Sequence, residues 1–221
     1  MKISDILREA PLPDDWDKSV YNKGNKGGFK ARIEYAKQKA QKIGAGSSRI
    51  AFIVEYQGRK TVLKIAKNNK GLAQNEQERY MLYTAQALHA DGSVTIPMID
   101  YDETADKPSW LHVEYAPKLK NEQQFEQLSG FNMEKLINYA GNLTHNRSLP
   151  ASHRMEFEKE WTQKVWENEE SFSYDFVSFV GNCELHLPDL LRPANWGVFN
   201  NRPVIIDLGL SEEIYTSLYS R

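Results

Sequence analysis

Two polar residues near the C-terminal end of the chain, Asn195 and Asp207, have the types and the spacing of a magnesium site. Short apolar runs at 196–199 and 204–206 flank a polar turn, and this pattern predicts a β-hairpin. If the runs pair, Asn195 and Asp207 meet at the open end of the hairpin. Their amide and carboxylate oxygens suit Mg²⁺, which completes its octahedron with water and substrate phosphate. Asp189, just upstream, adds a carboxylate that can orient a hydroxyl or a water.

The order of these residues resembles the catalytic-loop and metal-binding segments of the protein-kinase-like superfamily, which includes the aminoglycoside phosphotransferases. That family places an Asp about five residues before an Asn, then a hairpin, then Asp-Phe-Gly or a variant. Here Asp207-Leu208-Gly209 takes the last position, but Asp189 lies six residues before Asn195 and follows His186-Leu187-Pro188 instead of His-Arg. The metal pair therefore matches the family better than Asp189 does. Capping of turns by Asn195 and Asp207 is the alternative interpretation.

A glycine-rich segment, Gly44-Ala45-Gly46-Ser47-Ser48-Arg49, precedes an apolar strand candidate at 50–54. Glycines let backbone N–H groups approach phosphate oxygens without obstruction by a Cβ atom. The segment resembles the kinase glycine-rich loop with its third glycine replaced by Arg49, a charge that can itself reach phosphate. We therefore expect nucleotide phosphates to contact Gly44, Gly46, Ser47, Ser48 and Arg49. An ordinary hairpin turn is the alternative.

The strand predicted at 61–66 carries Val62 and Lys64 on one face, because residues two apart in a strand point to the same side. The pattern resembles the Val-Ala-Ile-Lys strand of kinases, in which the lysine binds the α- and β-phosphates and the valine covers the base. The resemblance implies a glutamate partner for Lys64 on the helix that follows, predicted at 72–88. Glu78 shares the more apolar face of that helix, so we assign it as the partner and keep Glu76 as the second choice.

The predicted elements give an α+β protein, and the resemblance implies that it has a two-lobed kinase-like fold. Strand candidates at 94–99 and 110–115 complete a small antiparallel sheet, and backbone groups from Glu114 to Ala116 fall where the family binds the adenine edge. We expect an N-terminal helical extension at 1–40, an N-lobe with one helix at 41–116, and a reduced, mainly helical C-lobe with a hairpin at 117–221. The helices are predicted at 4–10, 29–42, 122–128, 133–143, 153–168 and 172–185.

The composition restricts the classes of function. The chain has 221 residues, 40% of them apolar and 26% charged, which predicts a globular protein. A net charge of −2 argues against a nucleic-acid or membrane partner, and the lysines at positions 23, 26 and 30 make nucleic-acid binding a minor alternative. No apolar run is long enough to cross a bilayer and no secretory signal begins the chain. Cys183 is the single cysteine, so we expect a buried structural thiol and a cytoplasmic location.

Three short segments carry a narrower resemblance, to the compact kinase-fold proteins encoded by tailed bacteriophages. They are Gly-Ser-Ser-Arg, Lys-Gly-Leu-Ala-Gln-Asn and Arg-Pro-Ala-Asn-Trp-Gly. The resemblance implies a phage-encoded protein that acts in the host cytoplasm, with ATP and Mg²⁺ as cofactors and a small molecule or a protein as phosphate acceptor. The alternative is a pseudokinase that occupies a host or virion protein without catalysis. Arg49 and the displaced Asp189 favour it, and so do the twelve residues after Gly209, which are too few for a kinase activation segment.

Overall fold

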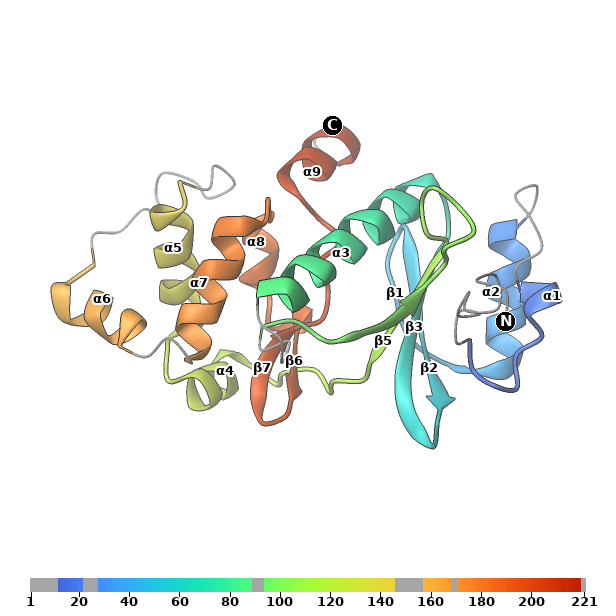
Figure 1. Ribbon diagram of the computed structural model, residues 1–221, viewed down its shortest axis with the longest axis horizontal. Coiled ribbons are helices and arrows are strands. Elements are labelled where there is room, and N and C mark those ends of the chain that lie inside the picture. The colour runs from blue at the N-terminus through green and yellow to red at the C-terminus, as the bar shows by residue number, and fades with distance from the viewer. Residues whose placement is uncertain (1–11, 22–27, 89–93, 146–156, 168–170, 220–221) are drawn as a thin grey trace, which may run out of the picture. The chain divides into compact units, whose positions relative to one another are not determined.

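A computed structural model describes residues 12–21, 28–88, 94–145, 157–167 and 171–219 (Figure 1). The described chain is α+β, as predicted, and it divides into two compact units. The first unit comprises residues 1–79 and 98–115, and the second comprises residues 80–97 and 116–221. The first contains an antiparallel sheet with one long helix, whereas the second is mainly helical with a hairpin, which agrees with the two-lobed kinase-like arrangement expected from the sequence.

The sheet of the first unit has five antiparallel strands in the order β1-β2-β3-β5-β4. The strands are β1 (Gln41–Ala45), β2 (Arg49–Tyr56), β3 (Arg59–Ala66), β4 (Met98–Tyr101) and β5 (Trp110–Glu114). Strands β2 and β3 are joined by a two-residue turn in which Gln57 and Gly58 both have positive φ, the geometry that suits a tight hairpin. Strand β3 therefore lies inside the sheet, between β2 and β5.

One face of this sheet is covered by the helices that precede it, α1 (Lys18–Tyr21) and α2 (Gly28–Lys39). Ala36 of α2 packs in the same core as Phe52, Leu63 and Ile65, all four with no exposed surface. Figure 1 shows α2, in blue, beside the strands. Because side chains alternate along β3, Lys64 belongs to the opposite face. The N-terminal helix therefore stabilises the strand that carries Lys64 without covering the lysine.

The long helix α3 (Asn69–Leu88) follows β3, and only its first part, up to residue 79, belongs to the first unit. The connection from β4 to β5 packs against it through a hydrogen bond of 3.0 Å from Asn75 Nδ2 to the Pro108 carbonyl. Asp102 orders this connection because its carboxylate accepts hydrogen bonds from the backbone N–H and hydroxyl groups of both Thr104 and Ser109. Burial alone would raise the pKa of Asp102, but these hydrogen bonds outweigh it and lower the pKa below its ordinary value of 3.8.

Replacing Asp102 with asparagine is expected to destabilise the protein by about 2 kcal/mol near neutral pH, because charged hydrogen bonds are lost. A lowered native pKa means that the carboxylate stabilises the fold above the unfolded-state pKa and loses this effect as the pH falls through the native pKa. The stability advantage of the wild type should therefore shrink below about pH 4. Urea unfolding of both proteins from pH 3 to pH 7 measures this, with Asp106→Asn in the same connection as an exposed control. A difference that is independent of pH would contradict the assignment.

The second unit contains most of the helices. After the C-terminal part of α3 they are α4 (Glu122–Ser129), α5 (Met133–Leu143), α6 (Lys159–Trp166), α7 (Phe172–Asn182), α8 (Leu187–Leu190) and α9 (Glu212–Leu218), with a 3-10 turn at Pro193–Asn195. Phe125, Phe172 and Phe176 surround Trp196, whose ring centroid lies 4.9 Å from that of Phe125. The indole N–H of Trp196 donates to the Leu190 carbonyl at 2.7 Å. The phenylalanines of α7 thus form core, as their helical spacing indicates.

The hairpin consists of β6 (Trp196–Phe199) and β7 (Arg202–Ile205), close to the predicted runs. Asn200 and Asn201 both have positive φ, which fits a two-residue turn of the type that asparagine favours. On its other side β7 pairs with the segment Val94–Ile96: the N–H of Ile205 donates to the Val94 carbonyl at 2.9 Å. This third segment fixes the hairpin within the second unit.

Several element bounds differ from the prediction. The helix expected at 29–42 ends at Lys39, and β1 takes Ile43 into the sheet as an edge-strand residue. The strand expected at 94–99 is two pieces, because Thr95 pairs with Ile205 whereas β4 begins at Met98. The helices expected at 153–168 and 172–185 are shorter, at Lys159–Trp166 and Phe172–Asn182. Residues 153–156 and 168 lie outside the described residues, as does the helix expected at 4–10. Apolar spacing predicts that a helix or strand exists, but it does not show at which residue the backbone changes its hydrogen-bond partners.

Candidate functional site

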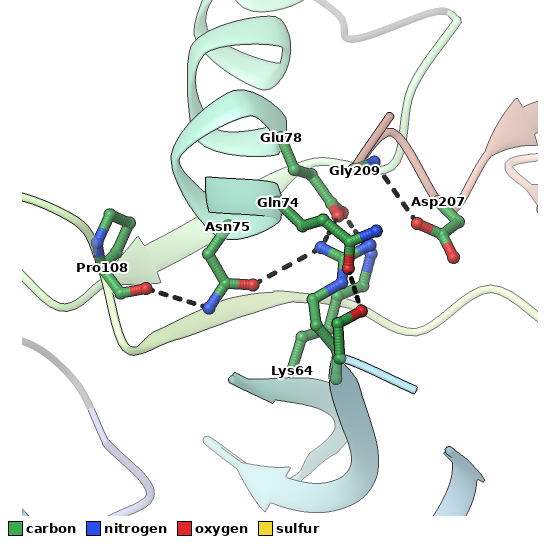
Figure 2. Close-up of polar contacts among 9 residues, drawn as sticks. Lys64, Gln74, Asn75, Glu78, Pro108, Asp207 and Gly209 are labelled. Carbon is green, nitrogen blue, oxygen red and sulfur yellow. Dashed lines mark hydrogen bonds and ion pairs between the residues drawn. The ribbon is translucent and has the colours of Figure 1, made fainter. Parts of the chain in front are cut away.

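In the first unit, Lys64 forms a buried ion pair with Glu78 (Figure 2). Lys64 projects from β3 on the same face as Val62, and Glu78 lies on α3 with 1% of its side chain exposed. The lysine ammonium contacts Oε1 of the glutamate. Glu76 instead makes an exposed ion pair of 2.8 Å with Lys107. The structure thus places Glu78, the preferred partner, beside Lys64.

Arg49 is a second cation on the same carboxylate. Its guanidinium Nη1 contacts Oε2 of Glu78 and lies 3.4 Å from Oδ1 of Asn75. Asn75 and Glu78 are three residues apart and therefore adjacent on one face of α3. Only 10% of the Arg49 side chain is exposed. Phosphate binding by Arg49 stays a prediction. The structure shows contacts of its side chain with α3, which the sequence did not predict.

The turn between β1 and β2 is shorter than the glycine-rich segment, because Gly44 and Ala45 already belong to β1. The N–H of Gly46 donates to the Arg49 carbonyl at 2.9 Å and closes the turn. Side chains from the start of α3 and the segment before it bind its other side: Gln74 contacts the Ser48 hydroxyl, and Asn68 donates to the Ser47 carbonyl at 3.2 Å. The turn is therefore anchored to α3, which the sequence did not show.

Gly71, in the first turn of α3, lies close to the backbone of this turn. A Cβ atom at position 71 would lie 2.3 Å from the Ser48 carbonyl oxygen and 3.0 Å from Ala66. We expect Gly71→Ala to destabilise the protein by about 2 kcal/mol, because backbone atoms would have to move. At a helical position with free space the same change stabilises the protein by up to about 1 kcal/mol. The sign of the change in unfolding free energy therefore shows whether position 71 is crowded. Gly44→Ala, where no atom lies within 4 Å of the added Cβ, is the control in chemical denaturation.

Three further residues were predicted to bind the base. Val62 is buried, with 8% of its surface exposed. Glu114 is the last residue of β5, where it is the strand partner of Thr61, and its carboxylate forms an ion pair of 2.6 Å with Arg59. Ala116 is buried and is the first residue of the second unit after β5. Contact of these residues with an adenine ring stays a prediction.

In the second unit, the hairpin brings Asn195 and Asp207 to its open end. The N–H of Ile206 donates to the Asn195 carbonyl at 2.9 Å, one residue beyond the last strand pair. The amide Nδ2 of Asn195 donates to the Asp189 carbonyl at 2.9 Å, which leaves Oδ1 as the side-chain atom of Asn195 able to bind a cation. The Asp207 carboxylate accepts from the Gly209 N–H at 3.4 Å (Figure 2). Asp207 is itself exposed.

Asp189 lies in the short helix α8, which precedes the hairpin, and it is half-buried. Burial raises its pKa above the ordinary value of 3.8, and the Asp207 carboxylate acts in the same direction. Arg192, whose Nη1 lies 3.5 Å from the Asp189 carboxylate, and His186 oppose this shift. The two aspartates therefore interact electrostatically within the second unit. A carboxylate with a raised pKa is a better proton acceptor, which suits the role predicted for Asp189.

His186 connects the Asp189 segment to the C-terminal helix. Its ring stacks on Tyr215 of α9 with centroids 4.1 Å apart, and Nδ1 lies 2.9 Å from the Glu212 carboxylate. Its backbone carbonyl accepts a hydrogen bond of 3.1 Å from the Asp189 N–H. Through these contacts His186 links α9 to α8, the helix that carries Asp189. The sequence did not indicate Glu212 and Tyr215, because they lie beyond every recognised motif.

The donor set fits a magnesium ion with few protein ligands. Within the described ranges, no three side chains of His, Cys, Asp or Glu cluster as a metal site. An ion at Asn195 and Asp207 would have those two ligands and would complete its shell with water and phosphate, as Mg²⁺ commonly does. Cys183 is buried, and burial raises the pKa of its thiol to about 12, so it is not a nucleophile. No helix in the described part of the chain has the length and apolar character needed to span a bilayer.

Comparison with known proteins gives fold neighbours of low similarity. No protein-family model matches the chain, and no curated protein matches it significantly. Among solved structures, a kinase domain of PknI from Mycobacterium tuberculosis aligns with a TM-score of 0.37 and 12% identity, covering 78% of this chain and 58% of that domain. A second structure of the PknI kinase domain gives a TM-score of 0.34 and 14% identity, with 78% and 57% covered. The chain therefore spans less than three-fifths of the length of these kinase domains.

Proposed function

We propose that this protein is a Mg-ATP-dependent phosphotransferase. The observation that supports this most directly is the buried Lys64–Glu78 pair, formed between an inner strand of the sheet and the helix that follows. A lysine held at one position by a buried carboxylate is suited to bind nucleotide phosphates as a fixed positive charge. The proposal requires that the two units bind the same nucleotide.

Each predicted residue has a role in this reaction. Lys64 binds the α- and β-phosphates, and the backbone N–H groups of Ser47 and Ser48 in the turn contact the phosphate chain. Asn195 and Asp207 hold Mg²⁺, which neutralises the charge of the β- and γ-phosphates. Backbone groups from Glu114 to Ala116 bind the adenine. Most of the catalysis then comes from positioning and charge neutralisation.

Asp189 orients the acceptor. Its carboxylate accepts the proton of the acceptor hydroxyl while the hydroxyl oxygen forms a bond to the γ-phosphorus and the bond to the ADP oxygen breaks. The raised pKa of Asp189 favours this proton transfer. The acceptor is then a hydroxyl group of a small molecule or a protein.

Titration with ATP, with and without Mg²⁺, tests the binding step. We expect ATP to raise the melting temperature of the protein, and to do so more with Mg²⁺ than without, because a ligand that binds only the folded state stabilises it. Incubation with γ-labelled ATP then tests transfer, to the protein itself or to a host lysate. Absence of a Mg-dependent shift at millimolar ATP would contradict the proposal.

The second candidate is a pseudokinase that acts by binding another protein. One observation favours it: Arg49, at the position where the resemblance places a glycine, anchors the turn to α3 through Glu78 and makes the turn less able to close over phosphates. The same titration separates the candidates, since a pseudokinase of this kind gives no Mg-dependent shift. The resemblance to tailed-phage proteins supports a phage origin and action in the host cytoplasm, with a host or phage protein as partner. Retention of one specific protein from infected-cell extract would test that partnership.

A further inference from the structure

We propose that Arg49 is a positioning residue that holds the Glu78 carboxylate in place while Lys64 engages nucleotide phosphate. This inference rests on the proposed nucleotide-binding function and extends it to a residue that the kinase resemblance does not assign to this task. It concerns only contacts within the first unit, from β2, β3 and α3.

The evidence is the division of the Glu78 carboxylate between two cations. Oε1 contacts Lys64 and Oε2 contacts Arg49. All three side chains are at least nine-tenths buried, with 10%, 10% and 1% exposed for Lys64, Arg49 and Glu78. Arg49 also has a second contact on α3, because Nη1 lies 3.4 Å from Asn75 Oδ1. Asn75 is held in turn by its bond to the Pro108 carbonyl.

A buried carboxylate with a single cation partner would oppose phosphate binding. When the ammonium moves toward a phosphate, the carboxylate loses its partner, and an uncompensated buried charge is strongly unfavourable. With Arg49 on the other oxygen, Glu78 keeps one ion pair throughout. Lys64 can then shift toward the phosphate at a lower cost in free energy. Arginine suits the role, because its planar guanidinium stays charged and offers several donors in fixed directions.

The same residue couples the glycine-rich turn to α3. The Arg49 carbonyl accepts the hydrogen bond from Gly46 that closes the turn, and its side chain binds α3 through Glu78. Ser48 adds a parallel contact to Gln74. Movement of α3 away from the sheet would therefore break contacts of the turn as well as the Lys64 pair. We infer that the turn and the Lys64–Glu78 pair assemble together.

The first experiment measures nucleotide affinity by calorimetry for Arg49→Met and Arg49→Lys. We expect Arg49→Met to weaken Mg-ATP binding by about tenfold or more and to leave adenosine binding within about twofold, because only phosphate binding requires Lys64 to shift. Arg49→Lys, which keeps the charge, should recover most of the loss. Lys60→Met is the control: Lys60 lies on the same β-hairpin and is exposed. Equal weakening of ATP and adenosine, or unchanged ATP affinity in Arg49→Met, would overturn the inference.

A second experiment needs no ligand. It compares urea unfolding of the wild type, Arg49→Met, Lys64→Met and the double variant. If either cation can hold Glu78, each single change is tolerated better than the loss of both. We then expect the double variant to lower the folding equilibrium constant by about tenfold more than the product of the two single effects. Additive effects would overturn the shared role of the two cations.

The two experiments separate this inference from the proposed function. If the wild type shows no binding of Mg-ATP, the proposed function fails, and the unfolding cycle alone then decides whether Arg49 holds Glu78 when Lys64 is absent. If Mg-ATP binds and Arg49→Met has no effect on its affinity, the function stands and the role of Arg49 is wrong.

Discussion

Replacing Asp207 with asparagine is expected to lower the rate of phosphate transfer by about a thousandfold and to remove the Mg-dependent part of ATP stabilisation. The physical reason is the loss of the one carboxylate in the proposed Asn195–Asp207 ligand pair. Metal stabilisation of developing charge on a phosphoryl group is worth several kcal/mol, which corresponds to a factor of this size. An asparagine keeps the shape and the hydrogen bond from Gly209, so the fold should persist.

The measurement is a thermal-shift titration with ATP at several Mg²⁺ concentrations, followed by a labelled-phosphate assay. Asp106→Asn, at an exposed position in the β4–β5 connection, provides the control for the loss of one negative charge. Asp207→Asn should retain ATP binding without Mg²⁺, because Lys64 and the glycine-rich turn are unchanged. An Asp207→Asn protein that still responds to Mg²⁺ as the wild type does would show that Asp207 is not the ligand.

Glu78→Gln is expected to destabilise the protein by about 3–5 kcal/mol, the usual effect of removing one partner from a buried ionic cluster. The glutamine would leave Lys64 and Arg49, each nine-tenths buried, without the carboxylate that both contact. This expectation depends on the first unit alone and does not require that the protein binds a nucleotide. Urea unfolding followed by circular dichroism measures the difference.

Glu76→Gln is the matched control, two residues earlier on the same helix. Its ion pair with Lys107 is formed by side chains that are 39% and 51% exposed, so we expect a loss below about 1 kcal/mol. Equal losses for the two variants would contradict the assignment of Glu78 as the central residue of the cluster. A larger loss for Glu76→Gln would instead favour the partner that the sequence ranked second.

Much of the fold follows from local patterns in the sequence. The run from Thr61 to Ala66 is β-branched and apolar enough to predict a strand, and the structure has it in β3, inside the sheet. The helix at Met133–Leu143 has the predicted bounds because an asparagine cap and regular apolar spacing define it. The predicted bounds are wrong where the chain changes its strand partner. Thr95 pairs with β7 whereas Met98 pairs with β5, and both partner strands are distant in the sequence.

The candidate site was predicted in part. The kinase resemblance implied a glutamate partner for Lys64, and the helical period selected Glu78 over Glu76. The same rules were silent on Arg49, because the direction of a side chain at the end of a turn depends on how the turn closes. Here a hydrogen bond from Gly46 closes it and α3 supplies the contacts of the arginine side chain. The sequence likewise indicated a polar hairpin end, but the bond from Asn195 to the Asp189 carbonyl depends on how the chain bends between them.

The sequence by itself determined the fold class, the positions of most helices and strands, and the residue types available for phosphate and metal chemistry, because these depend on composition and on periods of two and 3.6 residues. Only the tertiary structure decided which charges are buried together. The fold brings one glutamate, one lysine and one arginine from far-apart positions in the chain into a single buried cluster, in which the two cations share the glutamate carboxylate. Long-range packing of β2 and β3 against α3 produces this cluster, and local sequence patterns do not encode such packing.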